Sequence, residues 1–206
     1  PLKLVKLSLE IIYRKAEVSD CYKIAELMNL ASGWIIEFLY HDMDKDIGPV
    51  GIVERGIRNG QYPYNYNSCI IAELKDTVAG VSYSYPSSYH LLTERARKLI
   101  PSDRLYHLRD FFSTRIDNSW FIDSFGVEPL SQGLGIGTRL LELTMEKARK
   151  EGFSLLSLMV FQDNEDALRL YRSKGFKEIK KVPLNRHSLI PHDGGCFLME
   201  RNLKRD

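Results

Sequence analysis

The sequence has few cysteines, no long apolar run and no excess of charge of either sign, and each absence excludes a class of protein. Its three cysteines are far apart and its five histidines form no HExxH-like pattern, so we expect reduced thiols and no structural metal. No apolar run is long enough to span a bilayer. The apolar first residues are interrupted by Lys3 and Lys6 and lack a cleavage site of small residues, unlike a signal peptide. We therefore expect a cytoplasmic protein without a membrane partner.

The charges of the chain are nearly balanced. The 29 Lys and Arg residues against 27 Asp and Glu residues leave a formal net charge of +2. That balance gives no electrostatic reason to expect a nucleic-acid partner. With 206 residues, 44% of them hydrophobic, the chain can bury a substantial core, and we expect one domain over residues 1–206. Residues 87–118 form a charged, helical-looking insertion within it, which we expect on the sheet edge or against a second subunit.

Hydrophobic periodicity predicts the order of strands and helices. Alternation with period two predicts a first strand from Val5 to about Arg14 and a hairpin over residues 69–85 with a turn at Lys75-Asp76. Apolar stripes predict helices after Ser19, over residues 34–41 and over residues 50–58. Two more helices are expected in the insertion. The last third predicts strands over residues 120–127, 153–161, 176–182 and 196–202, with helices ending near residues 151 and 174. The almost wholly apolar strand 153–161 indicates a right-handed parallel crossover.

A glycine-rich turn follows the strand Trp120–Val127 and opens a helix. It reads Gln132-Gly-Leu-Gly-Ile-Gly137. The free N–H groups and the dipole of a first helical turn attract a pyrophosphate, and glycines let the backbone come close to it. The residues Thr138 and Arg139 exclude a Walker A loop, and the glycine spacing is not that of the dinucleotide fingerprint GxGxxG. The alternative is an ordinary tight turn between a strand and a helix.

Two motifs together point to one family. The pattern Gln-x-x-Gly-x-Gly from Gln132 to Gly137 resembles the acetyl-coenzyme A signature of the GNAT N-acetyltransferase superfamily. The stretch from Asn164 to Phe176 has the form N-x-x-A-x-x-L-Y-x-x-x-G-F and closely resembles the second GNAT motif. The resemblance is specific over residues 120–176. It implies an α/β fold, the GNAT acyl-CoA N-acyltransferase fold: a mixed central sheet with a parallel splayed strand pair flanked by helices. It further implies acetyl-CoA (coenzyme A) as cofactor, a small-molecule or peptide amine as acceptor, and a possible homodimer.

The resemblance also implies which groups bind the cofactor. Main-chain N–H groups of the glycine-rich turn would hold the pyrophosphate, with the Gln132 side chain adding an amide. The Val127 N–H would face the thioester carbonyl oxygen, where one such donor is worth roughly 3–4 kcal/mol in the transition state. Asn164 would bond the pantetheine amide or only cap its helix. The expected cofactor-binding residues are Phe125, Gly126, Val127, Gln132, Gly133, Leu134, Gly135, Ile136, Gly137, Thr138, Asn164, Ala167 and Tyr171.

Tyr171 and Asp123 are the candidate catalytic residues. Tyr171 shares a helix face with Ala167, and its phenol, with an ordinary pKa of about 10, would protonate the leaving thiolate. Its alternative is a core tyrosine. Asp123 would accept the proton of the amine, directly or through water, and we expect Phe125 and Val127 to share its face of the strand. Asp123 could instead be a structural residue that bonds a neighbouring backbone group. In that case Glu128 is the other candidate base.

Acceptor specificity is expected from residues 34–46 and from the loop 183–195. Glu37, Tyr40 and Asp42 could attract an amine or form a solvated face, and His187 and His192 could assist deprotonation or be merely exposed. No cysteine lies at the thioester position, which favours direct transfer in a ternary complex. The competing function is a non-catalytic acyl-CoA-binding regulatory module. A third function, that of a nicotinamide dinucleotide oxidoreductase, is disfavoured because the glycine spacing differs from the dinucleotide-binding fingerprint.

Overall fold

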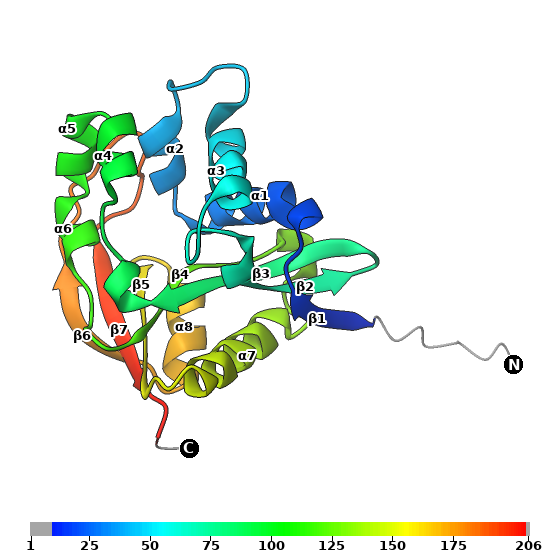
Figure 1. Ribbon diagram of the computed structural model, residues 1–206. Coiled ribbons are helices and arrows are strands. Elements are labelled where there is room, and N and C mark those ends of the chain that lie inside the picture. Colours follow the sequence, from blue (N-terminus) through cyan, green and yellow to red (C-terminus); the bar gives the residue numbers. More distant parts are fainter. Residues whose placement is uncertain (1–9, 205–206) are drawn as a thin grey trace, which may run out of the picture.

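The computed structural model describes residues 10–204 (Figure 1). These residues form a seven-stranded mixed sheet with the strand order β1-β2-β3-β4-β5-β7-β6. Only the β4–β5 pair is parallel, and the other neighbours are antiparallel. The expected α/β fold class is therefore confirmed. The strands are β1 (Ile11–Lys15), β2 (Cys69–Leu74), β3 (Thr77–Pro86), β4 (Trp120–Val127), β5 (Leu155–Phe161), β6 (Lys177–Val182) and β7 (Cys196–Asn202).

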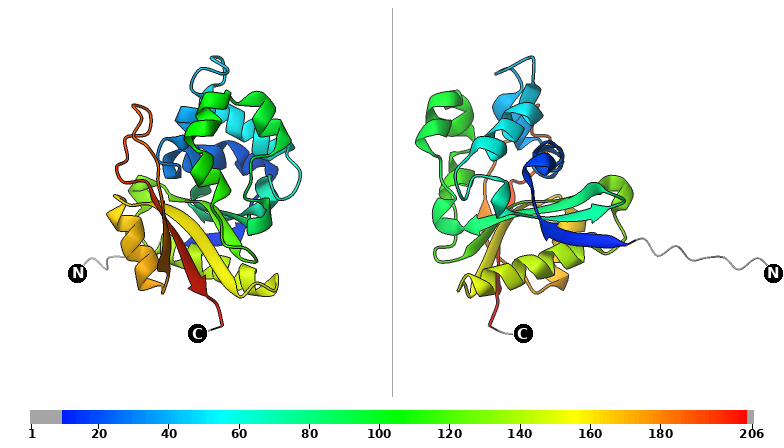
Figure 2. Two further views of the ribbon diagram at one scale, coloured as in Figure 1. Left: turned by 90° about the vertical axis from the view of Figure 1, so that its left-hand side faces the viewer. Right: turned by 45° about the vertical axis from the view of Figure 1, so that its right-hand side comes forward.

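Helices cover both faces of the sheet (Figures 1 and 2). One face carries α1, α2, α3 and the short helices of the insertion, and the other carries α7 and α8. The helices are α1 (Cys21–Ala31), α2 (Ile35–Tyr40), α3 (Gly48–Asn59), α4 (Glu94–Leu99), α5 (Ser102–His107), α6 (Arg109–Ser113), α7 (Ile136–Lys150) and α8 (Glu165–Ser173).

Most predicted elements have the expected bounds. The hairpin is confirmed: Leu74 pairs with Thr77, and both turn residues between them have positive φ, as a tight two-residue turn requires. The predicted first strand began at Val5, but its part before residue 10 lies outside the described residues, and β1 spans Ile11–Lys15. The insertion contains three short helices instead of two, because Leu108 separates α5 from α6.

Strands β4 and β5 diverge after a short paired segment. They pair only from Trp120 and Leu156 to Ile122 and Leu158. Beyond these pairs β4 continues to Val127 beside β3, and β5 continues to Phe161 beside β7. Each of the two strands thus stays paired with its other neighbour, but the edges of β4 and β5 that face each other are no longer paired. The expected parallel splayed pair is confirmed, and it leaves a gap in the middle of the sheet.

A β-bulge at Asp123 changes which residues of β4 share a face. Tyr83 pairs with Ser124 and Ser84 pairs with Ile122, so Asp123 has no partner on β3. After the bulge Phe125 pairs with Ser82, whose hydroxyl contacts Thr144 of α7 at 2.7 Å. Phe125 therefore faces α7, whereas Asp123 bonds Tyr85 on the α1 face. The prediction that Phe125 and Val127 share the face of Asp123 is wrong, because it assumed unbroken period two.

The insertion packs on α2 and on the face of β5, β7 and β6, not on the sheet edge. Leu108 is fully buried in an apolar cluster that joins Ile100 and Leu105 to Phe38 of α2 and Leu198 of β7. Such burial of long aliphatic side chains is worth about 1.5–3 kcal/mol for each residue. The insertion is thus an integral wall of the domain above the gap between β4 and β5.

Candidate active site

The N-terminus of α7 presents a run of main-chain donors. No residue of the described chain accepts a hydrogen bond from the N–H groups of residues 133–138, and the first bonded amide is that of Arg139, which donates to the Gly135 carbonyl at 3.1 Å. Gly133 and Gly135 have φ of 78° and 80°, a left-handed conformation that other residues rarely adopt. Together with the dipole of this 15-residue helix, these donors would attract an anion.

The backbone of this turn can be approached closely from outside. A Cβ at Gly133 or Gly135 would meet no atom of residues 10–204 within 4 Å, so the space at these two positions is open in this part of the chain. A Cβ at Gly137 would lie 3.7 Å from Leu170 and Val127 and 3.8 Å from Phe125, in ordinary contact only. The Gln132 side-chain amide donates to the Val127 carbonyl at 3.3 Å, so in this structure it braces the turn against the end of β4.

One main-chain amide of β4 points into the gap between the diverging strands. The Glu128 N–H donates to the Ala79 carbonyl on β3 at 2.8 Å. Because successive N–H groups of a strand point to opposite sides, the Val127 N–H points away from β3, toward the side where β5 no longer pairs. This is the position expected for the donor to the thioester carbonyl oxygen.

Helix α8 places Asn164, Ala167 and Tyr171 along the same gap. The Asn164 side-chain oxygen accepts the Ala167 N–H at 3.1 Å, so its capping role is present. Its side-chain N–H₂ group has no acceptor among residues 10–204 and remains available for a ligand. Ala167 is half-buried, and its small side chain keeps the gap open.

Tyr171 is a buried tyrosine with a free hydroxyl. Its ring lies 5.5 Å from that of Phe176 and 6.2 Å from that of Phe125, between centroids, so it is also part of the core. No described residue hydrogen-bonds its hydroxyl. Burial raises the pKa of Tyr171 above its ordinary value, so the phenol is protonated at neutral pH. It can donate a hydrogen bond but cannot act as a base.

Asp123 presents an exposed carboxylate on the opposite side of the gap. Its Oδ1 accepts the Tyr85 hydroxyl at 2.7 Å, and its Oδ2 accepts the Ser124 hydroxyl at 3.2 Å. Burial and the Asp123 charge raise the pKa of Tyr85 well above its usual range, which keeps that donor protonated. Glu128, the other carboxylate considered, forms an ion pair with Lys23 at 3.0 Å and does not line the cavity described next.

A cavity of about 720 Å³ passes through the gap in the sheet. It brings together Asp123, Phe125, Asn164, Ala167 and Tyr171. Gly126 and Val127 and the turn 132–138 are outside its lining, but Phe125 connects it to the turn through its approach to Gly137. We call the part beside α8 the cofactor side, and the part among α1, α2, α3 and the insertion the acceptor side.

A comparison with protein families matches residues 37–176 to the acetyltransferase (GNAT) family. The chain belongs to the GNAT family. Acetyltransferases of this family use acetyl-CoA, and the donors at α7 and the open gap fit that molecule.

Curated GNAT relatives match only part of the chain. N-alpha-acetyltransferase RimI of Mycobacterium tuberculosis is 43% identical over 81 residues, which are 39% of this chain and 48% of the relative. Mycothiol acetyltransferase of Thermomonospora curvata is 43% identical over 51 residues, which are 25% of this chain and 17% of the relative. The matched segments thus span half or less of the length of these relatives.

Solved GNAT structures share the fold over nearly the whole chain. An N-acetyltransferase from Staphylococcus aureus Mu50 superposes with a TM-score of 0.66 at 23% identity, covering 92% of this chain and 98% of that one. A PaiA N-acetyltransferase from Thermoplasma acidophilum, in complex with coenzyme A, has a TM-score of 0.55 at 16% identity and covers 94% and 99%. At these identities the likeness establishes the fold alone.

The acceptor side of this GNAT domain differs from the sequence expectation. Of the three expected residues of this segment, Tyr40 lines the cavity, but Glu37 and Asp42 do not. Glu37 accepts a hydrogen bond from Asn29 at 3.2 Å, and Asp42 accepts one from Arg104 at 2.6 Å. The loop 183–195 contributes no lining residue. His187 contacts Phe38, and His192 stacks on Phe161 at 3.8 Å with its Nδ1 2.8 Å from Asp163.

The sequence interpretation missed the lining residues of the insertion and of the tyrosine-rich segment before β2. These residues are Tyr64, Arg95, Leu99, Phe111 and Phe112. The aromatic run over residues 62–66 was a signal for them, but it was interpreted only as a turn. Residues 10–204 contain no group of three or more His, Cys, Asp or Glu residues placed to hold a metal ion. Within the same residues, no helix has the length and apolar character of a membrane span.

Proposed function

We propose that this protein transfers the acetyl group of acetyl-CoA directly to a primary amine of a small molecule or a peptide. The single observation that carries the proposal is the cavity through the gap between β4 and β5. It joins a proton donor, Tyr171, on one face of the sheet to a carboxylate, Asp123, on the other. A thioester held on the cofactor side and an amine on the acceptor side would meet in this gap.

The chain's own groups suit each part of the reaction. Bound acetyl-CoA supplies an activated acetyl group as a thioester. The free N–H groups at the α7 N-terminus would hold its phosphates, and the Val127 N–H would stabilise negative charge on the carbonyl oxygen. We assign the pantetheine arm to the open edge of β4, beside the free amide of Asn164 and the small side chain of Ala167.

Proton movements follow from Asp123 and Tyr171. An alkyl ammonium has an ordinary pKa of about 10.4, so at neutral pH it must lose a proton before it attacks. Asp123, an acceptor exposed to the cavity, would take that proton directly or through water. The buried phenol of Tyr171 would donate a hydrogen bond, and then its proton, to the sulfur as the carbon–sulfur bond breaks. Solvent would return the proton to Tyr171.

Three free cysteines, all buried, fit a reducing compartment. We therefore infer a cytoplasmic location.

Substitution of Tyr171 by Phe tests the proposed transfer. We expect kcat to fall 10²–10⁴-fold, because the variant lacks the general acid. The affinity for coenzyme A and the stability should change little, since the hydroxyl has no partner in the described protein. The measurement is release of free coenzyme A with a panel of amines, together with the mass of the acetylated product and calorimetry with coenzyme A.

Tyr66→Phe is the matched control, since Tyr66 packs in the core beside α1 and does not line the cavity. It should retain the rate of the unmodified protein. Tight binding of coenzyme A with no release for any amine would overturn the proposal and identify a regulatory acyl-CoA-binding module. Equal rates in Tyr171→Phe and Tyr66→Phe would remove Tyr171 from the reaction.

A further inference from the structure

The acceptor side of the cavity contains little charge. Among its described lining residues the only charged side chains are Asp123 and Arg95. The other carboxylates near α2 are engaged outside the cavity, Glu37 with Asn29 and Asp42 with Arg104. An acceptor with several positive charges would therefore find one carboxylate and one like charge. This composition limits the chemical class of amine that the cavity can hold.

The end of the acceptor side around Asp123 suits a single ammonium group. Tyr64 and Tyr83 line the cavity at this end, with their ring centroids 6.0 Å and 5.2 Å from that of Tyr85, whose hydroxyl bonds Asp123. Aromatic rings next to a carboxylate attract a cation by their electron-rich faces. Tyr40 of α2 completes this end, and its hydroxyl has no hydrogen bond within residues 10–204. Burial, and secondly the Asp123 charge, raise its pKa, which agrees with its position near the carboxylate.

The body of the acceptor side is apolar. Five helices, α1, α2, α3, α4 and α6, supply its walls, and most of their lining side chains are apolar. A ligand with several charges would find few partners for them there. Removal of an apolar ligand from water favours binding by about 0.8 kcal/mol for each buried CH₂ group. The aliphatic and aromatic side chains include Ile35, Leu39, Val53, Ile57, Leu99 and Phe112.

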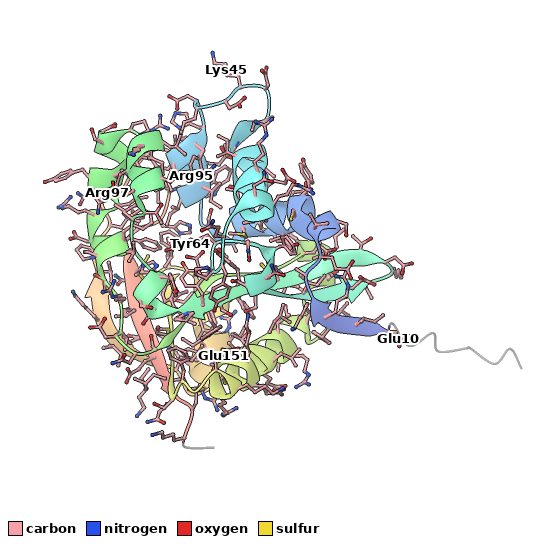
Figure 3. All side chains as sticks on the ribbon, viewed as in Figure 1. Glu10, Lys45, Tyr64, Arg95, Arg97 and Glu151 are labelled. Atoms are coloured by element: carbon pink, nitrogen blue, oxygen red, sulfur yellow. The ribbon has the colours of Figure 1, made fainter. Side chains whose placement is uncertain are left out.

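Arg95 provides the one positive charge on this wall. It lies on the side of α4 that faces α2, whereas Arg97 lies on the outer side (Figure 3). Arg95 has no ion pair or side-chain hydrogen bond to any described residue, so its charge is not neutralised within this part of the chain. A second ammonium group that reached α4 would meet this guanidinium without a compensating carboxylate.

We propose that the acceptor is a primary amine with one positive charge on an apolar body, and that Arg95 disfavours amines with a second positive charge. This assignment rests on the proposed acetyl transfer and names its substrate class. The amine can belong to a small molecule or to the first residue of a peptide, because both offer the same chemistry to Asp123 and the apolar walls.

A matched pair of amines tests the assignment. Pentylamine and 1,5-diaminopentane have the same carbon chain and differ by one charge. We expect kcat/KM for coenzyme A release, and the affinity measured by calorimetry with coenzyme A present, to favour pentylamine at least tenfold. 2-Phenylethylamine should exceed ethylamine at least tenfold, because it fills the apolar walls. Equal or better use of 1,5-diaminopentane or spermidine would overturn the assignment.

The Arg95→Glu variant tests the role of the wall charge, with Arg97→Glu as its matched control on the same helix. Arg95→Glu should lower the preference for pentylamine over 1,5-diaminopentane at least fivefold by improving use of the diamine. Arg97→Glu should retain the preference of the unmodified protein. The same preference in both variants would overturn the role of Arg95, even if the unmodified protein prefers monoamines.

The binding measurement separates this assignment from the proposed transfer. Absence of coenzyme A release with every amine would reject the transfer, but a tenfold binding preference for pentylamine would still support the acceptor chemistry. Equal binding of the two amines would reject the acceptor chemistry, whatever the turnover. Comparison of kcat/KM for a peptide amide that begins with Phe and for 2-phenylethylamine shows whether the amine belongs to a peptide or to a small molecule. Activity with either compound supports the proposed class of acceptor.

Discussion

At the scale of single residues, the two glycines that flank the first residue of α7 have different reasons to be glycine. Gly135 has φ of 80° and open space around it, so backbone conformation is the constraint there. Gly137 has no positive φ, and a Cβ at this position would make only ordinary contacts at 3.7 Å within the protein. Stability of the free protein therefore does not require glycine at position 137, and approach of a ligand to the helix start is the remaining reason.

We expect Gly137→Ala to separate stability from cofactor binding. Alanine in a helix is up to about 1 kcal/mol more favourable than glycine, so the free energy of unfolding should stay equal or rise. The affinity for coenzyme A should fall at least fivefold, because the added methyl group occupies the space beside Phe125 and Val127. Urea unfolding and calorimetry with coenzyme A measure the two quantities.

Gly135→Ala is the contrasting variant. An alanine forced into the left-handed region should lower the free energy of unfolding by roughly 1–2 kcal/mol. Should Gly137→Ala bind coenzyme A as tightly as the unmodified protein, the phosphates do not lie over the start of α7, and the assignment of the turn is wrong.

At the scale of elements, Arg104 joins the insertion to the acceptor side. Its buried guanidinium donates to the Leu39 carbonyl at the end of α2 at 2.9 Å and to the exposed Asp42 carboxylate at 2.6 Å. The carbonyl at the end of a helix lacks an intrahelical donor, so Arg104 satisfies a group that would otherwise be buried without a partner. Helix α2 carries Tyr40 and Leu39 into the cavity, and its position therefore depends on this contact.

Removal of this contact should affect the acceptor more than the cofactor. We expect Arg104→Ala to lower the free energy of unfolding by about 1.5–3 kcal/mol through the lost bond to the Leu39 carbonyl. It should raise KM for the amine several-fold and leave the affinity for coenzyme A nearly unchanged, because the side-chain bonds of Arg104 are to the end of α2 and to Asp42. Urea unfolding, steady-state kinetics and calorimetry give these values.

Asp42→Asn provides the control for Arg104, because it removes the exposed ion pair and keeps the buried bond. Its unfolding midpoint and KM should stay close to those of the unmodified protein. If Arg104→Ala weakened the binding of coenzyme A as much as that of the amine, the prediction would be wrong. The position of α2 would then affect both sides of the cavity and not the acceptor side alone.

At the scale of the whole molecule, one sheet carries both sides of the reaction, and the insertion closes it from above. The buried His90 lies at this junction, with its ring 4.2 Å from that of Phe121 on β4 and its Nε2 donating to the Phe111 carbonyl of α6 at 3.2 Å. Burial lowers the pKa of His90, and this outweighs the charge of Asp123, which acts in the opposite direction. In the folded protein His90 is therefore neutral at pH values where an exposed histidine gains a proton.

This difference should make the domain less stable in mild acid. Below the ordinary histidine pKa of about 6.5 the unfolded chain binds a proton at His90 that the folded chain does not, so stability is present above this pH and is lost as the pH falls below it. We expect His90→Gln to reduce the slope of the free energy of unfolding against pH between 7 and 5. Parallel slopes in the His90 variant and the unmodified protein would contradict the prediction.

The sequence by itself determined the parts of the site that lie close together along the chain. Gln132, Gly135 and Gly137 set the turn before α7, and Asn164, Ala167 and Tyr171 set one face of α8. Both are local arrangements, because helix periodicity and left-handed glycine conformations depend on neighbouring residues alone. The strand–helix–strand order around them predicted a parallel crossover, and the resemblance to the GNAT family implied the mixed sheet and its diverging parallel pair.

Only the tertiary structure decided the acceptor side. The bulge at Asp123 follows from the register of β4 against β3, and a slip of one residue reverses the faces that period two predicts. Arg95 and Tyr64 belong to segments far apart from β4 in sequence. Packing of the insertion on α2 brings Arg95 to the same cavity as Asp123, and Tyr64 reaches it beside the Tyr85 ring of β3. Such long-range packing depends on shape and burial across the whole domain, and no local pattern of residues contains that information.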